Sequence, residues 1–298
     1  MQQFTQNTSD NAILSIHTFD IESPKAVIQI VHGMEEHQER YEAFASFLNQ
    51  NGYSVVTSDL RGHGTTAKSL GHFKDKKGYL ALVEDQMQIR AFIAERYPDT
   101  PVYLFAHSMG TIISRVLLQT ESKQYQKVVL SGYPCYQLMT PIGIPMTAIL
   151  RLLRGPEYKS KFIQNVSVGV FNKAISNPKT DIDWVCANTD TVQAYMNDPY
   201  CGIGFTCAAF NDLYHLVLQM HKPKAYKNVH TSLPLLMLCG IDDPCTGGQK
   251  GTADSIRVLS NAGFQQIERI DYPGMRHEIL NEKDYQTVYQ NILDFYNH

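Results

Sequence analysis

The run Val102-Tyr-Leu-Phe-Ala-His-Ser-Met-Gly110 predicts an apolar strand that ends in a tight turn, and residues 109–120 predict a helix directly after it. A strand-to-helix turn of this kind lifts a serine hydroxyl above the edge of a sheet, where it can act as a nucleophile. The helix points its positive end toward the place where an oxyanion would form. Because a serine two residues before a glycine is common by chance, the case for Ser108 depends on three further segments.

The first of these segments places a glycine turn after another apolar strand. Residues 28–31 predict the strand, His32-Gly33 ends it, and the chain continues into a helix with charge at its start. In hydrolases with a serine at a strand-to-helix turn, the loop after such a strand supplies one N–H of the oxyanion hole, and the residue after the serine supplies the other. Met34 and Met109 are therefore the candidate donors, through their backbone N–H groups. Without Ser108, an ordinary strand-turn-helix would be the better interpretation.

The second segment offers a carboxylate. Leu233-Pro-Leu-Leu-Met-Leu-Cys-Gly-Ile-Asp-Asp-Pro244 predicts a buried strand followed by a polar loop with two adjacent acids. A serine–histidine pair needs one buried carboxylate, which holds the imidazole tautomer and stabilises the imidazolium formed during attack. Asp242 and Asp243 both suit this role, and both also suit a simple turn before Pro244.

The third segment offers a base. Residues 267–272 predict a last strand, Pro273-Gly274 turns the chain, and His277 lies in the loop before the final helix. The chain has 11 histidines, and a loop histidine is more often only solvated than catalytic. The chain order Ser, Asp, His, with a secondary-structure element between each pair, favours His277 as the base for Ser108.

Together these motifs resemble the monoacylglycerol lipase and lysophospholipase branch of the α/β-hydrolases, often labelled serine aminopeptidase-like. The resemblance implies an α/β-hydrolase fold, with a mostly parallel sheet flanked by helices and an inserted, mainly helical cap. The matching motifs span positions 32 to 282 and are His32-Gly33-Met34-Glu35-Glu36-His37 with Arg40-Tyr41, Asp59-Leu60-Arg61-Gly62-His63-Gly64, His107-Ser108-Met109-Gly110, Gly240-Ile241-Asp242-Asp243-Pro244 and Gly274-Met275-Arg276-His277-Glu278-Ile279-Leu280-Asn281-Glu282.

The resemblance also assigns roles to single residues. The family pattern Gly-x-x-Asp implies that Asp243 is the acid, beside Ser108 as nucleophile and His277 as base. The family usually begins its nucleophile motif with glycine, whereas this chain has Ala106. Since alanine adds only a methyl group, we expect altered packing and no loss of activity. The resemblance also implies that the loop over residues 61–64 has a structural role and no catalytic one.

The composition of the 298-residue chain suits one α/β domain with an insertion. Apolar residues make up 43%, which is enough for a sheet covered on both faces, and the formal net charge is −3. This charge gives no electrostatic reason to expect a nucleic-acid partner or a strongly anionic membrane surface. The first ten residues lack the pattern of a secretion signal, and no run approaches the roughly 20 apolar residues that cross a bilayer. A cytoplasmic location is therefore the default expectation.

The six cysteines are expected to be reduced thiols. They form no Cys-x-x-Cys pair and have no histidine spacing typical of zinc, so we expect no metal, and the chemistry requires no organic cofactor. Cys245, two residues past the predicted acid, is a candidate for the pocket wall. It is not a candidate nucleophile, because no base is indicated for it.

Strand and helix signals alternate over residues 1–132 and resume over 227–298, which predicts the hydrolase core. Between 133 and 226 the strand signals vanish, and short helical runs, prolines and aromatic residues take their place. Such an insertion lies above the carboxyl ends of the strands, where ligands bind in open α/β sheets, so it is predicted to be a cap. The predicted strands are 13–19, 26–31, 54–57, 102–105, 127–130, 235–238 and 266–270, and the predicted helices of the core are 40–49, 80–96, 109–120, 248–262 and 283–296.

The predicted cap contains an apolar stripe at helical spacing within residues 145–154. The simpler interpretation is that this stripe packs on the core, and the functional one is that it lines an acyl channel or touches lipid aggregates. The stripe consists of Met146, Ile149, Leu150 and Leu153. The expected substrate contacts are Ile149, Leu153, Phe205 and Cys245.

Three functions fit these observations. The leading one is a serine carboxylic-ester hydrolase that acts on monoacylglycerols, lysophospholipids or other small-molecule acyl esters through an acyl-enzyme intermediate. The second uses the same machinery on an amide or thioester, as an aminopeptidase, amidase or thioesterase. The third is a non-catalytic binding module with a hydrolase fold, which is disfavoured because all three triad candidates are present. Acyl length, head group and oligomeric state stay open.

Overall fold

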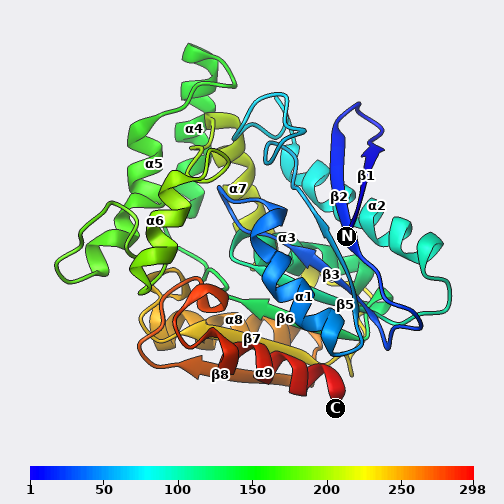
Figure 1. Cartoon of the computed structure of the whole chain (residues 1–298). Coiled ribbons are helices and arrows are strands. Elements are labelled where there is room, and N and C mark those ends of the chain that lie inside the picture. Colours follow the sequence, from blue (N-terminus) through cyan, green and yellow to red (C-terminus); the bar gives the residue numbers. More distant parts are fainter.

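An eight-stranded sheet forms the centre of the computed structural model, which describes residues 1–298 (Figure 1). The strand order is β1-β2-β4-β3-β5-β6-β7-β8. Strands β3 to β8 run parallel to one another. At one edge of the sheet, β2 runs antiparallel to both of its neighbours, β1 and β4. The strands are β1 (Gln2–Asn7), β2 (Ile13–Phe19), β3 (Val27–Val31), β4 (Ser54–Ser58), β5 (Val102–His107), β6 (Lys127–Ser131), β7 (Leu235–Gly240) and β8 (Ile267–Tyr272).

Successive side chains of the central strands pack on opposite faces of the sheet. In β5, Leu104 and Ala106 belong to the core on one face, whereas Phe105 belongs to the core on the other. An apolar run is buried in this way only when helices cover both faces. The first face is covered by α2 (Gly78–Arg96), α3 (Met109–Glu121) and α8 (Gly248–Ala262), and the second by α1 (Glu42–Gln50) and α9 (Tyr285–Asn297).

This arrangement confirms the predicted mostly parallel sheet with helices on both faces. Strand β1 is an addition to the predicted strands, and it pairs antiparallel with β2 at the edge of the sheet. Its sequence is polar apart from Phe4, whose ring packs against Phe92 of α2 at a centroid distance of 5.5 Å. The strand is therefore held by backbone pairing and by contacts of Phe4 and Gln2 with α2, including those to Arg96, rather than by an apolar face.

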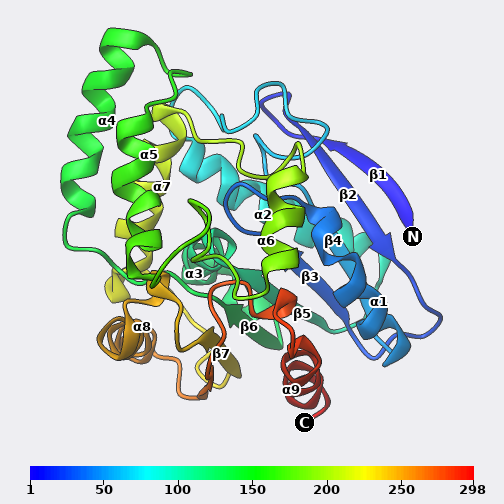
Figure 2. The same ribbon diagram turned by 60° about the vertical axis from the view of Figure 1, so that its left-hand side comes forward.

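Between β6 and β7 the chain forms helices and no strand. Helices α4 and α5 lie on the side of the molecule away from β1 (Figures 1 and 2). Helix α7 packs against α4 and also against α3, so it joins the insertion to the helices of the core. The insertion contains α4 (Thr140–Arg154), α5 (Lys161–Ser167), α6 (Thr189–Asn197) and α7 (Cys207–Met220), with 3-10 turns at Gly169–Ala174 and Pro223–Ala225.

Only part of the predicted apolar stripe lies on the buried side of α4, where Met146 and Leu150 are partly buried and pack against the core. Gly143 and Thr147 face α7, and a Cβ at position 143 would collide with the ring of Tyr214. Small residues at these two positions permit the close approach of the two helices. Ile149 and Leu153 are instead 57% and 71% exposed. No helix of the protein combines the length and the apolar character that a membrane span requires.

Candidate active site

Ser108 lies at the turn between β5 and α3. Its φ of +50° and ψ of −121° form a conformation that side-chain-bearing residues rarely adopt, so the turn is strained. A Cβ at Gly110 would collide with the carbonyl oxygen of Val31, and glycine therefore lets α3 begin directly against the end of β3. This local sequence places the serine hydroxyl at the carboxyl edge of the sheet, as its strand-turn-helix pattern predicts.

Three side chains form a continuous hydrogen-bonded chain at this edge. His277 Nε2 lies 2.7 Å from Ser108 Oγ, and His277 Nδ1 lies 2.9 Å from Asp243 Oδ2. The other oxygen of Asp243 accepts a hydrogen bond from the backbone N–H of Cys245 at 2.8 Å. All three side chains are buried. These partners assign Nδ1 as the donor to the carboxylate and leave Nε2 to accept from the hydroxyl.

The structure separates the two adjacent acids that the sequence leaves as alternatives. Asp242 is exposed, and its backbone N–H donates to the carbonyl oxygen of Met275 at 3.1 Å. Asp243 is turned inward and reaches His277. Only Asp243 is therefore placed to hold the imidazole.

The surroundings of His277 favour its protonated form. Burial lowers the pKa of this imidazole, but the charge and hydrogen bond of Asp243, together with nearby Glu278, raise it by more, and the net pKa lies above the ordinary value. The ring of His107 lies 4.8 Å from that of His277. Burial, with a smaller contribution from His277, lowers the pKa of His107 to about 3. His107 is therefore neutral near pH 7 and does not repel an imidazolium.

Two backbone N–H groups beside the serine have no acceptor within the protein. They belong to Met109, which follows Ser108, and to Met34, which follows β3. A Cβ at Gly33 would lie 3.0 Å from Ser108 Cβ, so the turn after β3 passes directly beside the serine. Glu36 fixes this turn by accepting the N–H of Gly33 at 2.5 Å. Met34 and Met109 can therefore donate to an oxygen bound at Ser108.

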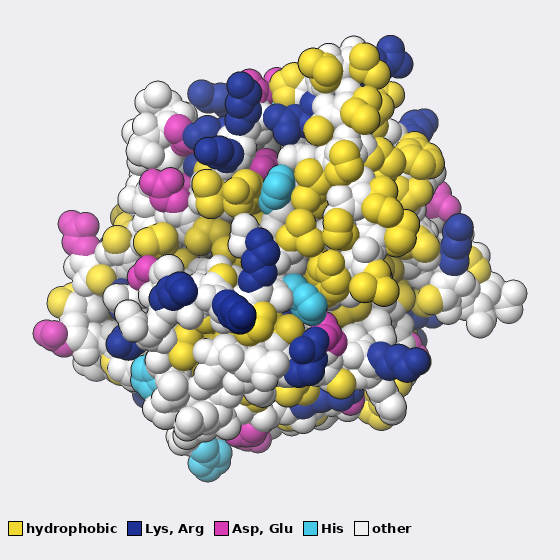
Figure 3. Space-filling model, turned by 180° about the vertical axis from the view of Figure 1, so that it is seen from behind, with side chains coloured by type: hydrophobic (Ala, Val, Ile, Leu, Met, Phe, Trp, Pro, Cys, Tyr) yellow, Lys and Arg dark blue, Asp and Glu magenta, His cyan; other side chains and the backbone are white.

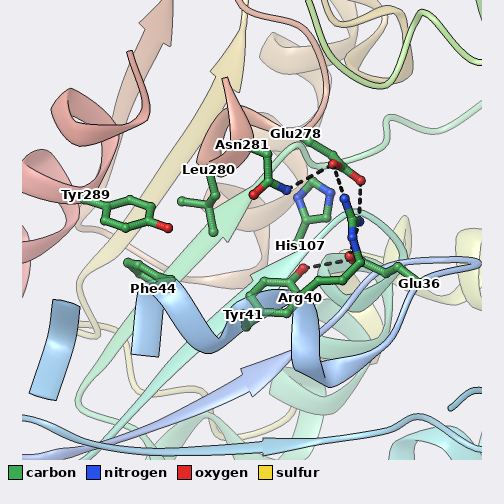
Figure 4. Close-up of a pocket in the computed structure, with 9 residues that line it drawn as sticks. All are labelled: Glu36, Arg40, Tyr41, Phe44, His107, Glu278, Leu280, Asn281 and Tyr289. Atoms are coloured by element: carbon green, nitrogen blue, oxygen red, sulfur yellow. Dashed lines mark hydrogen bonds and ion pairs between the residues drawn. The ribbon is translucent and has the colours of Figure 1, made fainter. Parts of the chain in front are cut away.

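An ion network links this turn to the loop that carries His277, and Figure 4 shows it around a small cavity beside His107. Arg40 donates to Glu36 at 2.8 Å and, through two nitrogens, to Glu278 at 2.6 Å each. Burial raises the pKa of Glu278, but Arg40 outweighs it and holds that pKa well below its usual range. For Glu36 the effect of burial exceeds that of Arg40, and its pKa is raised.

Replacing Arg40 with methionine should lower the free energy of unfolding by about 3–5 kcal/mol, because two buried carboxylates lose their shared cation. Urea unfolding followed by circular dichroism measures this loss. The matched control is Arg257→Met, since the Arg257 side chain is 60% exposed and pairs with Asp254 at the surface. That pair should contribute less than about 1 kcal/mol. Equal effects of the two substitutions would show that the network does not bind the loops together.

The four expected substrate contacts occupy different environments. Ile149 and Leu153 lie on the outer surface of α4. Phe205 is fully buried and packs edge-to-face against Phe73, with ring centroids 4.9 Å apart. Cys245 is buried beside the acid, through its hydrogen bond to Asp243.

Several contacts at the site join segments that the sequence did not connect. The ring of Trp184, in the insertion, lies 5.0 Å from the ring of His277. His37, after the turn that follows β3, pairs with Asp198 of the insertion at 2.8 Å. The sequence contains one tryptophan, but nothing local to it indicates which loop it would meet.

Two groups of side chains bring possible metal ligands within 4.8 Å of one another. The first consists of Asp243, Cys245 and His277, whose acid and base already pair. The second consists of His37, Asp198 and Cys201, in which the imidazole and the carboxylate also hydrogen-bond to each other. In each group the imidazole and the carboxylate thus already hydrogen-bond to each other.

The chain is similar to known hydrolases over nearly its whole length. The family model described as serine aminopeptidase, S33, matches residues 22–284. A phospholipase of Bacillus subtilis, YtpA, is 25% identical over 279 residues, covering 92% of this chain and 95% of the phospholipase. A monoacylglycerol lipase of Mycolicibacterium smegmatis is 24% identical over 272 residues, covering 91% and 88%.

The solved structures agree with the sequence relatives. A thermostable carboxyl esterase from Bacillus coagulans, in complex with glycerol, has a TM-score of 0.89 and 27% identity, covering 99% of this chain and 97% of the esterase. These matches confirm the α/β-hydrolase fold and the resemblance to the lipase branch that the motifs indicated. The chain is a serine hydrolase, and it belongs to the serine aminopeptidase S33 family of α/β-hydrolases.

Proposed function

We propose that this enzyme hydrolyses carboxylic esters of the monoacylglycerol and lysophospholipid class, with Ser108 as nucleophile, His277 as base and Asp243 as acid. The observation that carries the proposal is the hydrogen-bonded chain from the serine hydroxyl through both imidazole nitrogens to the buried carboxylate. The names of the relatives, phospholipase and monoacylglycerol lipase, and the glycerol held by the similar esterase support an acyl ester of a glycerol-type alcohol as substrate.

The mechanism follows from these positions. His277 Nε2 takes the proton of Ser108 Oγ as the oxygen attacks the ester carbonyl, and Asp243 stabilises the resulting imidazolium. The N–H groups of Met34 and Met109 hold the tetrahedral oxyanion. His277 then gives its proton to the departing alcohol, which leaves the acyl group on the serine. Water, deprotonated by His277 in turn, attacks this acyl-enzyme and releases the fatty acid.

Residues 133–226 form the cap in this proposal, over a core made of residues 1–132 and 227–298. Its contacts with the triad region support this role. Trp184 packs on His277, and the Tyr195 hydroxyl donates to the carbonyl oxygen of Glu35 at 2.7 Å. The insertion thus meets both the loop of the base and the turn of the proposed oxyanion hole.

The outer surface of the cap supports transient contact with lipid aggregates. Figure 3 shows hydrophobic side chains gathered over the side of the molecule where α4 lies. Soluble proteins rarely expose large contiguous apolar patches unless the patch binds something. Arg151 and Arg154 of α4 can place positive charge next to this surface. Its exposed members include Leu138, Met139, Ile142, Ile149, Leu152, Leu153 and Phe162.

A substrate panel tests the proposed function. It compares p-nitrophenyl esters of rising acyl length, monoacylglycerols below and above their aggregation concentration, and aminoacyl p-nitroanilides, each with untreated and fluorophosphonate-treated enzyme. We expect ester hydrolysis that the fluorophosphonate abolishes, and faster turnover of monoacylglycerol once it aggregates. Faster cleavage of the anilides than of every ester would overturn the proposal in favour of an aminopeptidase.

A further inference from the structure

A short segment of the insertion, residues 183–188, is fastened to the loop that carries His277. The backbone N–H of Glu278 donates to the carbonyl oxygen of Val185 at 2.8 Å. The carboxylate of Glu282 accepts the backbone N–H groups of Ala187 at 2.8 Å and Asn188 at 3.1 Å. The same carboxylate also accepts the N–H of Arg276, the residue before the base, at 2.8 Å. The position of this segment and the position of the base loop are therefore set together.

Trp184, the only tryptophan of the chain, lies within this segment and faces the base. It is 8% exposed, and its ring centroid is 5.0 Å from that of His277, with the two planes at 43°. Phe171 also packs against the indole, with ring centroids 5.1 Å apart. The backbone N–H of Trp184 donates to the side chain of Asn172 at 3.0 Å. The indole is therefore held against the imidazole by contacts from the 3-10 turn at Gly169–Ala174.

The indole can act on the charge that His277 carries during the reaction. An aromatic ring attracts a cation within about 6 Å of its centroid, and tryptophan does so more strongly than phenylalanine. Resting on the triad roles proposed above, we propose that Trp184 is a positioning residue that keeps the His277 imidazole between Ser108 and Asp243 and stabilises its protonated form. The cap then contributes directly to proton transfer.

The other titratable and charged groups around His277 belong to residues that a Trp184 substitution does not change. They are the carboxylates of Asp243, Glu36 and Glu278, the thiol of Cys245, the neutral ring of His107 and, beyond the two glutamates, the guanidinium of Arg40. All of them remain when the indole is replaced. A change in the titration of His277 in a Trp184 variant therefore reports the indole itself.

Steady-state kinetics against pH provide the first test, with a soluble p-nitrophenyl ester. Trp184→Leu should lower kcat about 3- to 20-fold and shift the acid limb of kcat/KM to lower pH, because the imidazolium loses a stabilising contact. Trp184→Phe keeps an aromatic face, so most of kcat and most of the wild-type position of the acid limb should be retained in this variant. A purely structural role would lower kcat or the yield of folded protein without moving the acid limb, and that result would overturn the proposal.

Fluorescence of the unmodified chain provides a second test that needs no turnover. An imidazolium in contact with an indole quenches its emission, so the emission of Trp184 should rise with pH in one step as His277 loses its proton. Where an ester is hydrolysed, this step should coincide with the kinetic acid limb. His277→Gln should remove this step, and a step that persists in that variant would refute the contact. If the wild type hydrolyses no ester, the proposed function fails while the fluorescence titration still decides this inference. If Ser108→Ala abolishes activity and the Trp184 variants match the wild type, only the inference fails.

Discussion

Alanine at position 108 should lower kcat for ester substrates by about 10⁴- to 10⁶-fold, because it removes the proposed nucleophile, Ser108 Oγ, which lies 2.7 Å from His277 Nε2. Residual turnover would come from the oxyanion donors and substrate binding, which the substitution leaves in place. The variant should also lose covalent labelling by a fluorophosphonate, measured as the mass of the intact protein. Alanine retains the backbone and the Cβ of the strained turn, so the melting temperature should change little.

The matched control is Ser114→Ala, two turns further along α3. Ser114 is fully buried, and its hydroxyl has no hydrogen-bond partner within the protein. Its loss should leave both kcat and labelling close to those of the wild type. Full stoichiometric labelling of the Ser108→Ala protein would show that another residue is the nucleophile.

The parts of the site that could be predicted from sequence depend on local signals. The apolar run of β5, the turn at Ser108 and the start of α3 are adjacent in the chain, and each has a pattern of its own. The two carboxylates after β7 share one local environment, so the pattern alone left Asp242 and Asp243 as alternatives. Tertiary contact separates them, because only Asp243 reaches the imidazole.

The parts that could not be predicted depend on contacts between distant segments. Strand β1 is polar, and it forms because β2 offers a free edge for backbone pairing. The helical spacing of α4 correctly predicted a helix and the packing of Met146 and Leu150 on the core, but not the close approach of Gly143 to Tyr214. The packing of Trp184 on His277 requires the insertion to fold back over the sheet, and no periodicity in the sequence encodes that path.

Asparagine at position 243 should lower kcat/KM by about 10⁴-fold. An amide cannot match the carboxylate in holding Nδ1 protonated, so the tautomer with a basic Nε2 toward Ser108 is no longer enforced. The charge of Asp243 also raises the pKa of His277. Its removal lowers that pKa, and the acid limb of the residual activity should move to lower pH. Rates with a p-nitrophenyl ester across the pH range measure both effects.

The neighbouring acid provides the control for this prediction. Asp242→Asn removes the same charge one residue away, from a side chain that is exposed and does not reach the base. Because solvent screens that charge, this variant should keep its rate within about twofold and its acid limb unchanged. The pair of variants therefore separates the general loss of a negative charge near the loop from the loss of the one carboxylate that contacts the imidazole. A large effect of Asp242→Asn with a small effect of Asp243→Asn would reverse the assignment of the acid.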